Sequence, residues 1–112
     1  MSVKPVIDQF KALAHPLRYA ILEELGARER NVSEIEQATG IGQPTLSQQL
    51  AVLRKSGLVQ TRRAAKLVYY RIAPEQITGL AQALNALAGL DPSAPVERRI
   101  PSPGAANFAR LS

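Results

Sequence analysis

Side chains suited to hydrogen bonding gather on one face of residues 43–56. On a helical wheel, with about 100° per residue, Leu46, Leu50 and Leu53 fall together and face a core. The opposite face carries Pro44, Ser47, Gln48, Ala51 and Lys55, with Thr45 at its border. Amides and hydroxyls on such a helix can bond base edges in the major groove of DNA, and its first amides suit a phosphate oxygen. The alternative is an ordinary solvated helix face.

Basic residues without neighbouring acids extend from this helix toward the C-terminus. The chain has 14 Lys and Arg and 9 Asp and Glu, a net charge of +5, yet residues 37–74 hold six bases and no acid. These bases are Arg54, Lys55, Arg62, Arg63, Lys66 and Arg71. A surface without carboxylates repels itself unless a polyanion neutralises it, although a charge run is often only a solvated face. We therefore expect double-stranded DNA as the partner, with Arg62, Arg63 and Lys66 on flanking phosphates or in a minor groove.

The composition argues against several other kinds of chemistry. With no cysteine and one histidine, the sequence offers no disulfide, no thiolate metal site and no zinc ligand set. Neither a nucleophile–base pair nor a phosphate-binding loop is present, so we expect no enzyme, metal or cofactor. No apolar run approaches the ~20 residues that cross a bilayer, and the N-terminus lacks a secretory pattern. A cytoplasmic protein without a membrane partner is expected.

The hydrophobic pattern predicts a fold that is mainly α with a small β-hairpin. Helical spacing of apolar residues predicts helices over 3–14, 16–25, 33–39, 43–56 and 74–90. A period of two predicts strands over 58–63 and 67–72, joined by a turn at 64–66 that lacks Gly and Asn. This order is a helix-turn-helix followed by a two-stranded wing. We expect a winged helix-turn-helix DNA-binding and dimerisation domain over residues 1–90 and an irregular Pro-rich tail over 91–112.

Local signals predict where helices begin and end. Pro16 and Pro44 suit the first turn of a helix, where a missing N–H costs nothing. Gly26 is expected to end the second helix. Ser33 and Glu36 have the spacing of a capping box, with Val32 extended before it.

Three aromatic or titratable residues have two interpretations each. His15 is expected to mark the boundary before the second helix, and a titratable sensor is the alternative. Tyr69 and Tyr70 point to opposite faces of one strand, so one belongs to the core. The sequence does not decide which of the two tyrosines that is.

Apolar stripes on the first and last helices exceed what a thin core needs. The stripes consist of Val6, Ile7, Phe10, Ile77, Leu80, Leu84 and Leu87. Exposed apolar surface of this kind usually marks an interface, which predicts a homodimer. The alternative is that the Pro-rich tail covers the stripe of its own chain.

Four segments together resemble the winged-helix repressors of the arsenical-resistance (ArsR/SmtB) family. The segments are Leu13-Ala-His-Pro-Leu-Arg-Tyr-Ala-Ile-Leu22, residues 43–54, Gly57-Leu-Val and residues 62–71. The resemblance implies a homodimeric bacterial repressor with helix 43–56 in the major groove and wing 61–71 on the backbone. Gln43, Thr45, Ser47, Gln48 and Gln49 match the family's recognition segment, and Gln49 stands where the family often has His. The wheel places Gln49 nearer the core than Gln48.

Sensing residues known from the family are missing. Asn31 and Ser33 occupy the thiolate metal motif, and residues 77–90 contain none of the Asp, His and Glu of the other metal site. The Thr61-Arg-Arg and Val68-Tyr-Tyr patterns resemble the family's symbiosis and biofilm regulators. Glu23 stands where some of these have a sensing cysteine. A metal sensor and a thiol switch are both disfavoured, and a small-molecule effector is left open.

The expected function is therefore a sequence-specific repressor that binds an inverted-repeat operator as a homodimer. Its two recognition helices would lie about 34–36 Å apart. A non-specific architectural DNA-binding protein that uses the same basic segment is the alternative. Footprinting separates the two, because only the first protects a discrete site. The operator sequence and the target genes are not determined by the sequence.

Overall fold

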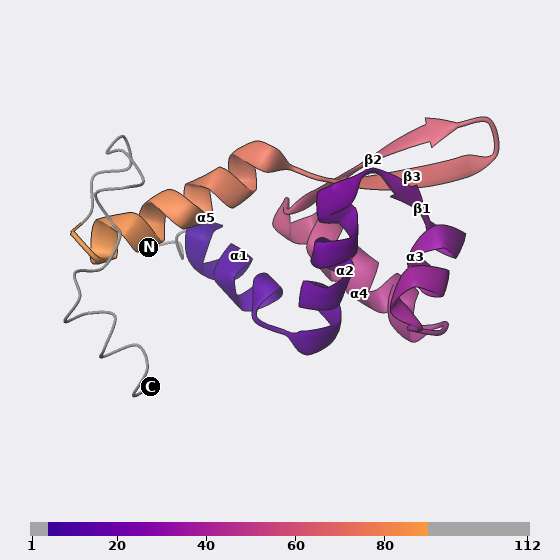
Figure 1. The fold of residues 1–112 in the computed structure, drawn as a ribbon, viewed down its shortest axis with the longest axis horizontal. Helices are drawn as coiled ribbons and strands as arrows, with labels where there is room; N and C mark the ends of the chain where they lie inside the picture. The colour runs from indigo at the N-terminus through magenta and orange to yellow at the C-terminus, as the bar shows by residue number, and fades with distance from the viewer. Residues whose placement is uncertain (1–4, 90–112) are drawn as a thin grey trace, which may run out of the picture.

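The computed structural model describes residues 5–89, which form five helices and three strands (Figure 1). In chain order these are α1 (Pro5–Leu13), α2 (Pro16–Ala27), β1 (Arg30–Asn31), α3 (Val32–Thr39), α4 (Thr45–Ser56), β2 (Val59–Ala64), β3 (Leu67–Ile72) and α5 (Pro74–Leu87). In Figure 1, α1 and α5 lie at one end of the molecule and the β2–β3 hairpin projects from the other. The expected winged helix-turn-helix is confirmed. The expected tail over 91–112 lies outside the described residues.

A core of aliphatic side chains lies between the middle helices and the base of the hairpin. The largest fully buried side chains are Ile21, Ile35, Leu46, Leu50, Leu53 and Leu58. Three of them come from α4, at the positions that the wheel assigned to the core. Burying each Leu side chain stabilises the fold by about 1.5–3 kcal/mol, so α4 has one favoured rotation about its axis. Its polar face is thereby turned outward.

The sheet has three antiparallel strands in the order β1-β3-β2, one more than the sequence predicted. Arg30 and Asn31 form the extra strand opposite Tyr70 and Tyr69. A two-residue strand carries too little periodicity to be recognised in a sequence. Its pairing covers the edge of β3 that the hairpin leaves open.

The start of α3 corrects the expected capping box. Asn31 Oδ1 accepts a hydrogen bond from the Glu34 amide at 2.9 Å, and Glu34 Oε1 accepts one from the Asn31 amide at 2.9 Å. The box is therefore Asn31–Glu34, two residues before Ser33–Glu36, and Val32 is helical. The physical reason is that β1 pairs with β3 only as far as Asn31, so the chain turns into the helix there.

Two further helix ends differ from their predictions. Helix α2 continues through Gly26 to Ala27, and the extended backbone of Arg28, with φ −174°, ends it. Pro44 lies at the N-cap of α4, and the first turn begins at Thr45. The predicted ends of helices 33–39 and 43–56 are confirmed, since Gly40 and Gly57 follow them with the positive φ that favours glycine.

Two sequence alternatives are decided by contacts. His15 Nδ1 accepts a hydrogen bond from the Leu17 amide at 3.2 Å, which makes His15 the N-cap of α2 and supports its structural role. Tyr70 packs against the core. Tyr69 lies on the other face of β3, under the guanidinium of Arg62.

Candidate nucleic-acid interface

Helix α4 presents a polar face at the surface of the protein. Pro44, Ser47, Gln48, Ala51 and Lys55 are all exposed, as the wheel predicted. Among the described residues, Gln48 makes no side-chain hydrogen bond, so both its amide donor and its acceptor are available. An unpaired, outward amide near the N-terminal end of a helix has the geometry that bonds an adenine edge in a major groove.

Two backbone amides in the first turn of α4 already have hydrogen-bond partners in the residues just before the helix. Gln43 Oε1 accepts hydrogen bonds from the Ser47 amide at 3.1 Å and from Ser47 Oγ at 2.7 Å. The Leu46 amide donates to the Gly42 carbonyl at 2.9 Å. The expectation that these amides are free for a phosphate oxygen is therefore wrong at Leu46 and Ser47. Half-buried Thr45 lies at the border of the exposed face, as expected.

Gln49 faces the rest of the protein. Its Oε1 accepts a hydrogen bond of 2.8 Å from Arg18 Nη1 on α2. The wheel placed Gln49 nearer the core than Gln48, and its half-buried side chain agrees. Of the five positions in the recognition segment, Gln48 is the one that the structure leaves both exposed and unpaired among the described side chains.

A hollow of about 400 Å³ borders the exposed face of α4 on the side of the sheet. It is lined by Val32, Ser47, Leu50, Ala51, Arg54, Lys55 and Tyr70. Arg54 was not among the predicted site residues, although it follows Ser47 by two helical turns and so shares its stripe. That spacing was the signal in the sequence that could have identified it.

The two arginines of the wing point to opposite faces of the hairpin. In the register of β2 and β3, Arg62 is opposite Tyr69 and Arg63 is opposite Val68. Directly opposed residues share a face of a sheet and neighbours alternate, so Arg63 is on the face of Tyr70, beside α4. Arg63 is exposed, and exposed Lys66 lies in the turn at the tip.

Arg62 is engaged within the protein. Its Nε and Nη2 donate hydrogen bonds to the two carboxylate oxygens of Glu29, at 2.8 and 2.6 Å. These bonds hold the pKa of Glu29 below its ordinary value and raise the pKa of Arg62. Its guanidinium also lies 4.9 Å from the ring centroid of Tyr69, within the range of a cation–π contact.

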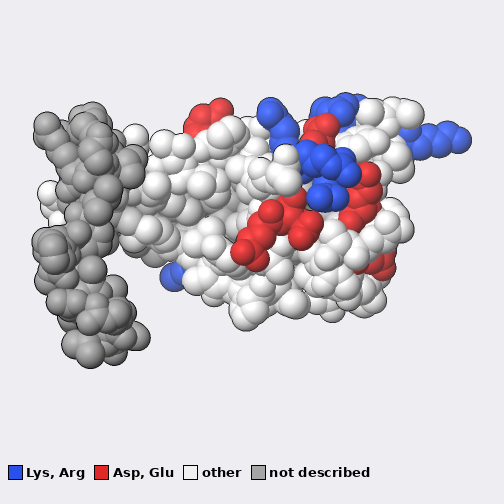
Figure 2. Space-filling view, in the orientation of Figure 1, with Lys and Arg blue, Asp and Glu red and all other residues white. Residues whose placement is uncertain are grey.

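Glu29 shows that a segment without acids in sequence is not free of acids in space. It precedes Arg62 by 33 residues, and no local pattern in the sequence signals their pairing. In Figure 2, red and blue groups lie next to one another over α2 and the base of the hairpin, while blue atoms project alone at the tip. The positive surface of the wing is thus smaller than the charge count predicted.

The candidate interface residues on α1 and α5 fall into three groups. Ile7, Leu84 and Leu87 are 43%, 54% and 84% exposed. Val6, Phe10 and Ile77 are partly buried against the protein's own core. Leu80 is 4% exposed and belongs to that core, which corrects its assignment to the exposed stripe. Among the described residues, the largest exposed apolar side chains of these two helices lie in the C-terminal half of α5.

Residues 5–89 hold neither a metal site nor a membrane span. This part of the chain has no group of three His, Cys, Asp or Glu side chains placed to hold a metal ion. Within the same range, no helix has the length and apolar character that a membrane span requires.

The fold and the exposed helix define a winged helix-turn-helix protein of the DNA-binding type. Residues 15–61 match the family described as "Bacterial regulatory protein, arsR family". The chain is 48% identical over 79 residues to the biofilm growth-associated repressor of Xylella fastidiosa, a match that covers 70% of this chain and 69% of that protein. This chain therefore belongs to the arsR family of bacterial regulatory proteins.

Solved structures agree with this assignment. The crystal structure of the transcriptional repressor BigR from Xylella fastidiosa superposes with a TM-score of 0.61 at 46% identity, over 73% of this chain and 84% of that one. NolR from Sinorhizobium fredii superposes with a TM-score of 0.63 at 32% identity, over 79% and 88%. The family consists of transcriptional regulators, which bears out the expectation that this chain is not an enzyme, and its likeness to the biofilm and nodulation regulators is confirmed.

Proposed function

We propose that this protein is a sequence-specific transcriptional repressor that binds an inverted-repeat DNA operator as a homodimer. The observation that carries the proposal is the rotation of α4, which buries Leu46, Leu50 and Leu53 and leaves Ser47 and Gln48 outward. Relatives named as repressors share about half of its residues over the winged helix, with 48% identity. The proposal includes a cytoplasmic location, because the protein must reach its operator DNA there.

In this proposal, α4 enters the major groove and the wing lies on the backbone. Arg54 and Lys55, in the last turn of α4, and Lys66, at the wing tip, supply cations for the phosphates that flank the groove. Arg63 shares the α4 side of the hairpin and is the wing arginine placed for a phosphate. Arg62, paired with Glu29, is a weaker candidate than the sequence indicated.

The partner in the homodimer is a second copy docked through α1 and α5. Leu84 and Leu87 are more than half exposed, and Ile7 lies on the neighbouring helix. Exposed leucines in the last turns of an amphipathic helix suit self-association by a two-fold axis, which presents the same apolar patch twice. Two copies of α4 would then meet two half-sites about one DNA turn apart.

Selection from a random-sequence DNA pool followed by footprinting tests the proposal. The expected result is an enriched inverted repeat with a discrete protected region and a stoichiometry of two chains per site. Gln48→Ala provides the matched variant, because it removes one outward amide and leaves the core intact. Uniform coverage without an enriched sequence would instead establish the architectural DNA-binding alternative, and the absence of DNA binding at low salt would refute both.

A further inference from the structure

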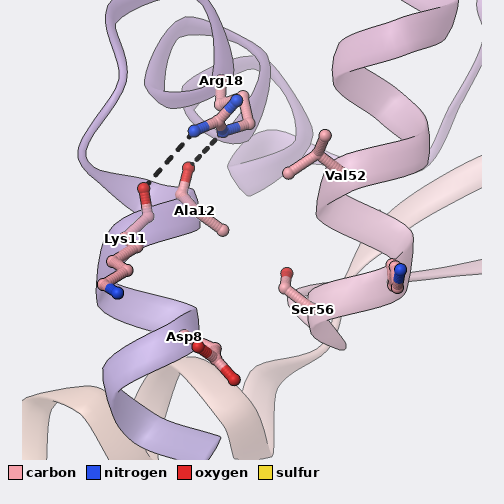
Figure 3. Close-up of a pocket in the computed structure, with 7 residues that line it drawn as sticks. Asp8, Lys11, Ala12, Arg18, Val52 and Ser56 are labelled. Carbon is pink, nitrogen blue, oxygen red and sulfur yellow. Dashed lines mark hydrogen bonds between the residues drawn. The ribbon is translucent and has the colours of Figure 1, made fainter.

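Arg18, near the start of α2, joins two other helices through one guanidinium. Its Nε donates to the Ala12 carbonyl at 2.6 Å, and its Nη2 reaches the Lys11 carbonyl at 3.4 Å (Figure 3). Its Nη1 donates to Gln49 Oε1 on α4 at 2.8 Å. The same side chain therefore contacts the end of α1 and the exposed helix.

The acceptors on α1 and on α4 explain why an arginine suits this position. The last carbonyls of α1 lack partners within their own helix, and a cation is favoured there by the helix dipole. Arginine offers five N–H donors in a rigid planar fork, so two can cap α1 while a third reaches Gln49. A lysine ammonium offers no such fork and cannot span both acceptors with fixed geometry.

Side chains do not fill all of the space between α1 and α4. A hollow of about 360 Å³ lies between them, bordered by Ala12, Val52 and Ser56 among others (Figure 3). Two residues of its lining, Arg18 and Ser56, take part in polar links between helices. Arg18 and Gln49 form one, and the nearly buried Gln9 forms the other by donating to the Ser56 carbonyl at 3.1 Å.

We propose that Arg18 is a positioning residue for DNA recognition. By joining the end of α1 to Gln49, Arg18 fixes the orientation of α4 relative to the α1–α5 end of the molecule. In a homodimer docked through α1 and α5, that orientation sets the separation of the two recognition helices. Arg18 thus determines which half-site spacing the protein prefers. This inference rests on the proposed function, since it concerns the same DNA site.

Affinity for a series of spacers tests the proposal. The half-site enriched by the wild-type protein is placed in inverted repeats that differ only in spacer length, and binding is measured by fluorescence anisotropy. Arg18→Met is expected to bind the preferred spacer about tenfold more weakly and to flatten the preference across the series, with base preference inside each half-site kept. A smaller folded fraction would lower all affinities together, so the ratio between spacers reports positioning.

Three further variants make the result specific. Gln49→Met cuts the link on the α4 side and is expected to flatten the spacer preference as Arg18→Met does, with no further flattening in the double variant. Arg18→Lys keeps the charge without the fork and is expected to resemble Arg18→Met. Arg28→Met removes an exposed cation at the opposite end of α2, away from α4, and is expected to keep the wild-type preference.

The outcomes separate this inference from the function on which it rests. An Arg18→Met protein with the wild-type spacer preference would overturn the inference, as would full rescue by Arg18→Lys. A changed base preference in Gln49→Met would also overturn it, because Gln49 would then read DNA directly. If the wild-type protein enriches no inverted repeat at all, the proposed function fails before any variant is made.

Discussion

Arg62 and Glu29 join the wing to the segment that follows α2. Two hydrogen bonds, of 2.8 and 2.6 Å, link the guanidinium to both carboxylate oxygens, with side-chain exposures of 55% and 26%. An exposed pair contributes little to stability by itself, because solvent screens it. Its main consequence is electrostatic: Arg62 already has an anionic partner, whereas Arg63 has none within residues 5–89.

The two wing arginines are expected to differ in DNA binding. Arg63→Ala should weaken binding to all sequences and make the slope of log K against log salt shallower. The expected change is about 0.9 for each phosphate that the variant leaves without its cation, hence nearly two in a homodimer. Arg62→Ala should change the slope less, because Glu29 already neutralises Arg62. Anisotropy titrations at several salt concentrations measure both slopes.

Glu29→Gln is the matching variant for that comparison. It removes the carboxylate and leaves the Arg62 charge available, so a steeper salt slope than that of the wild type is expected. Equal slopes for Arg62→Ala and Arg63→Ala would contradict the difference that we assign to Glu29.

The pKa of Glu29 is expected below its ordinary value, because hydrogen bonds from Arg62 stabilise the carboxylate. A group with a lowered pKa contributes stability above its unfolded pKa and loses that contribution as the pH falls through the lowered value. The ion pair between Glu29 and Arg62 is therefore fully formed at neutral pH and is lost as Glu29 becomes protonated in acid. Carboxyl ¹³C NMR titration measures the pKa directly.

Variants of the two nearby arginines separate the causes of that shift. Arg62→Ala should return the pKa of Glu29 toward its ordinary value. Arg71→Ala should have a smaller effect, since Arg71 acts only through its charge. A Glu29 that titrates at the same pH with and without Arg62 would contradict the assignment.

Gln48→Ala is expected to cost about 1–3 kcal/mol of binding to the enriched operator and to relax the preference at one base pair in each half-site. The reason is that the Gln48 amide faces outward from the first turn of α4 with no partner among the described side chains. Titrations on operator and scrambled DNA measure the difference. Gln82→Ala, on the exposed surface of α5, serves as the control, and an equal weakening on both DNAs would exclude direct readout by Gln48.

Leu84→Glu with Leu87→Glu is expected to convert the proposed homodimer to a monomer, because the new charges would be buried unpaired at the proposed interface. Light scattering after size exclusion measures the mass. Leu80→Ala should act differently: Leu80 is buried within the chain, so its truncation should cost about 2–5 kcal/mol of unfolding free energy. A dimer that survives the double substitution would place the interface elsewhere.

Ala65→Gly is expected to stabilise the protein by about 1 kcal/mol, since Ala65 has a φ of 57° and the left-handed region penalises a Cβ by about that amount. Urea unfolding measures the change. Ala64→Gly, one residue earlier in β2, should instead destabilise it by about 0.5–1 kcal/mol, because glycine gains freedom in the unfolded chain. Equal effects at both positions would contradict a role for the φ of Ala65.

Periodicity in the sequence determined the five helices, the two strands of the hairpin and the rotation of α4, but not β1. Leu46, Leu50 and Leu53 recur at helical spacing, and a hydrophobic stripe on a helix must face the core, so the outward position of Gln48 followed without any structure. The ends of the helices were predicted less accurately than their positions. Asn31 and Ser33 both have the chemistry of a cap, and only the short pairing of β1 with β3 selects Asn31.

What the sequence determined by itself, then, was which side chains each helix turns outward, because the geometry of a helix is local. Only the tertiary structure decided which charges meet: Glu29 lies beside Arg62 across 33 residues of chain, and Arg18 reaches Gln49 across 31. Such contacts depend on how the elements pack, and no short-range pattern records them. The same packing turned Leu80 inward and left Leu84 and Leu87 exposed, although all three share one helical stripe.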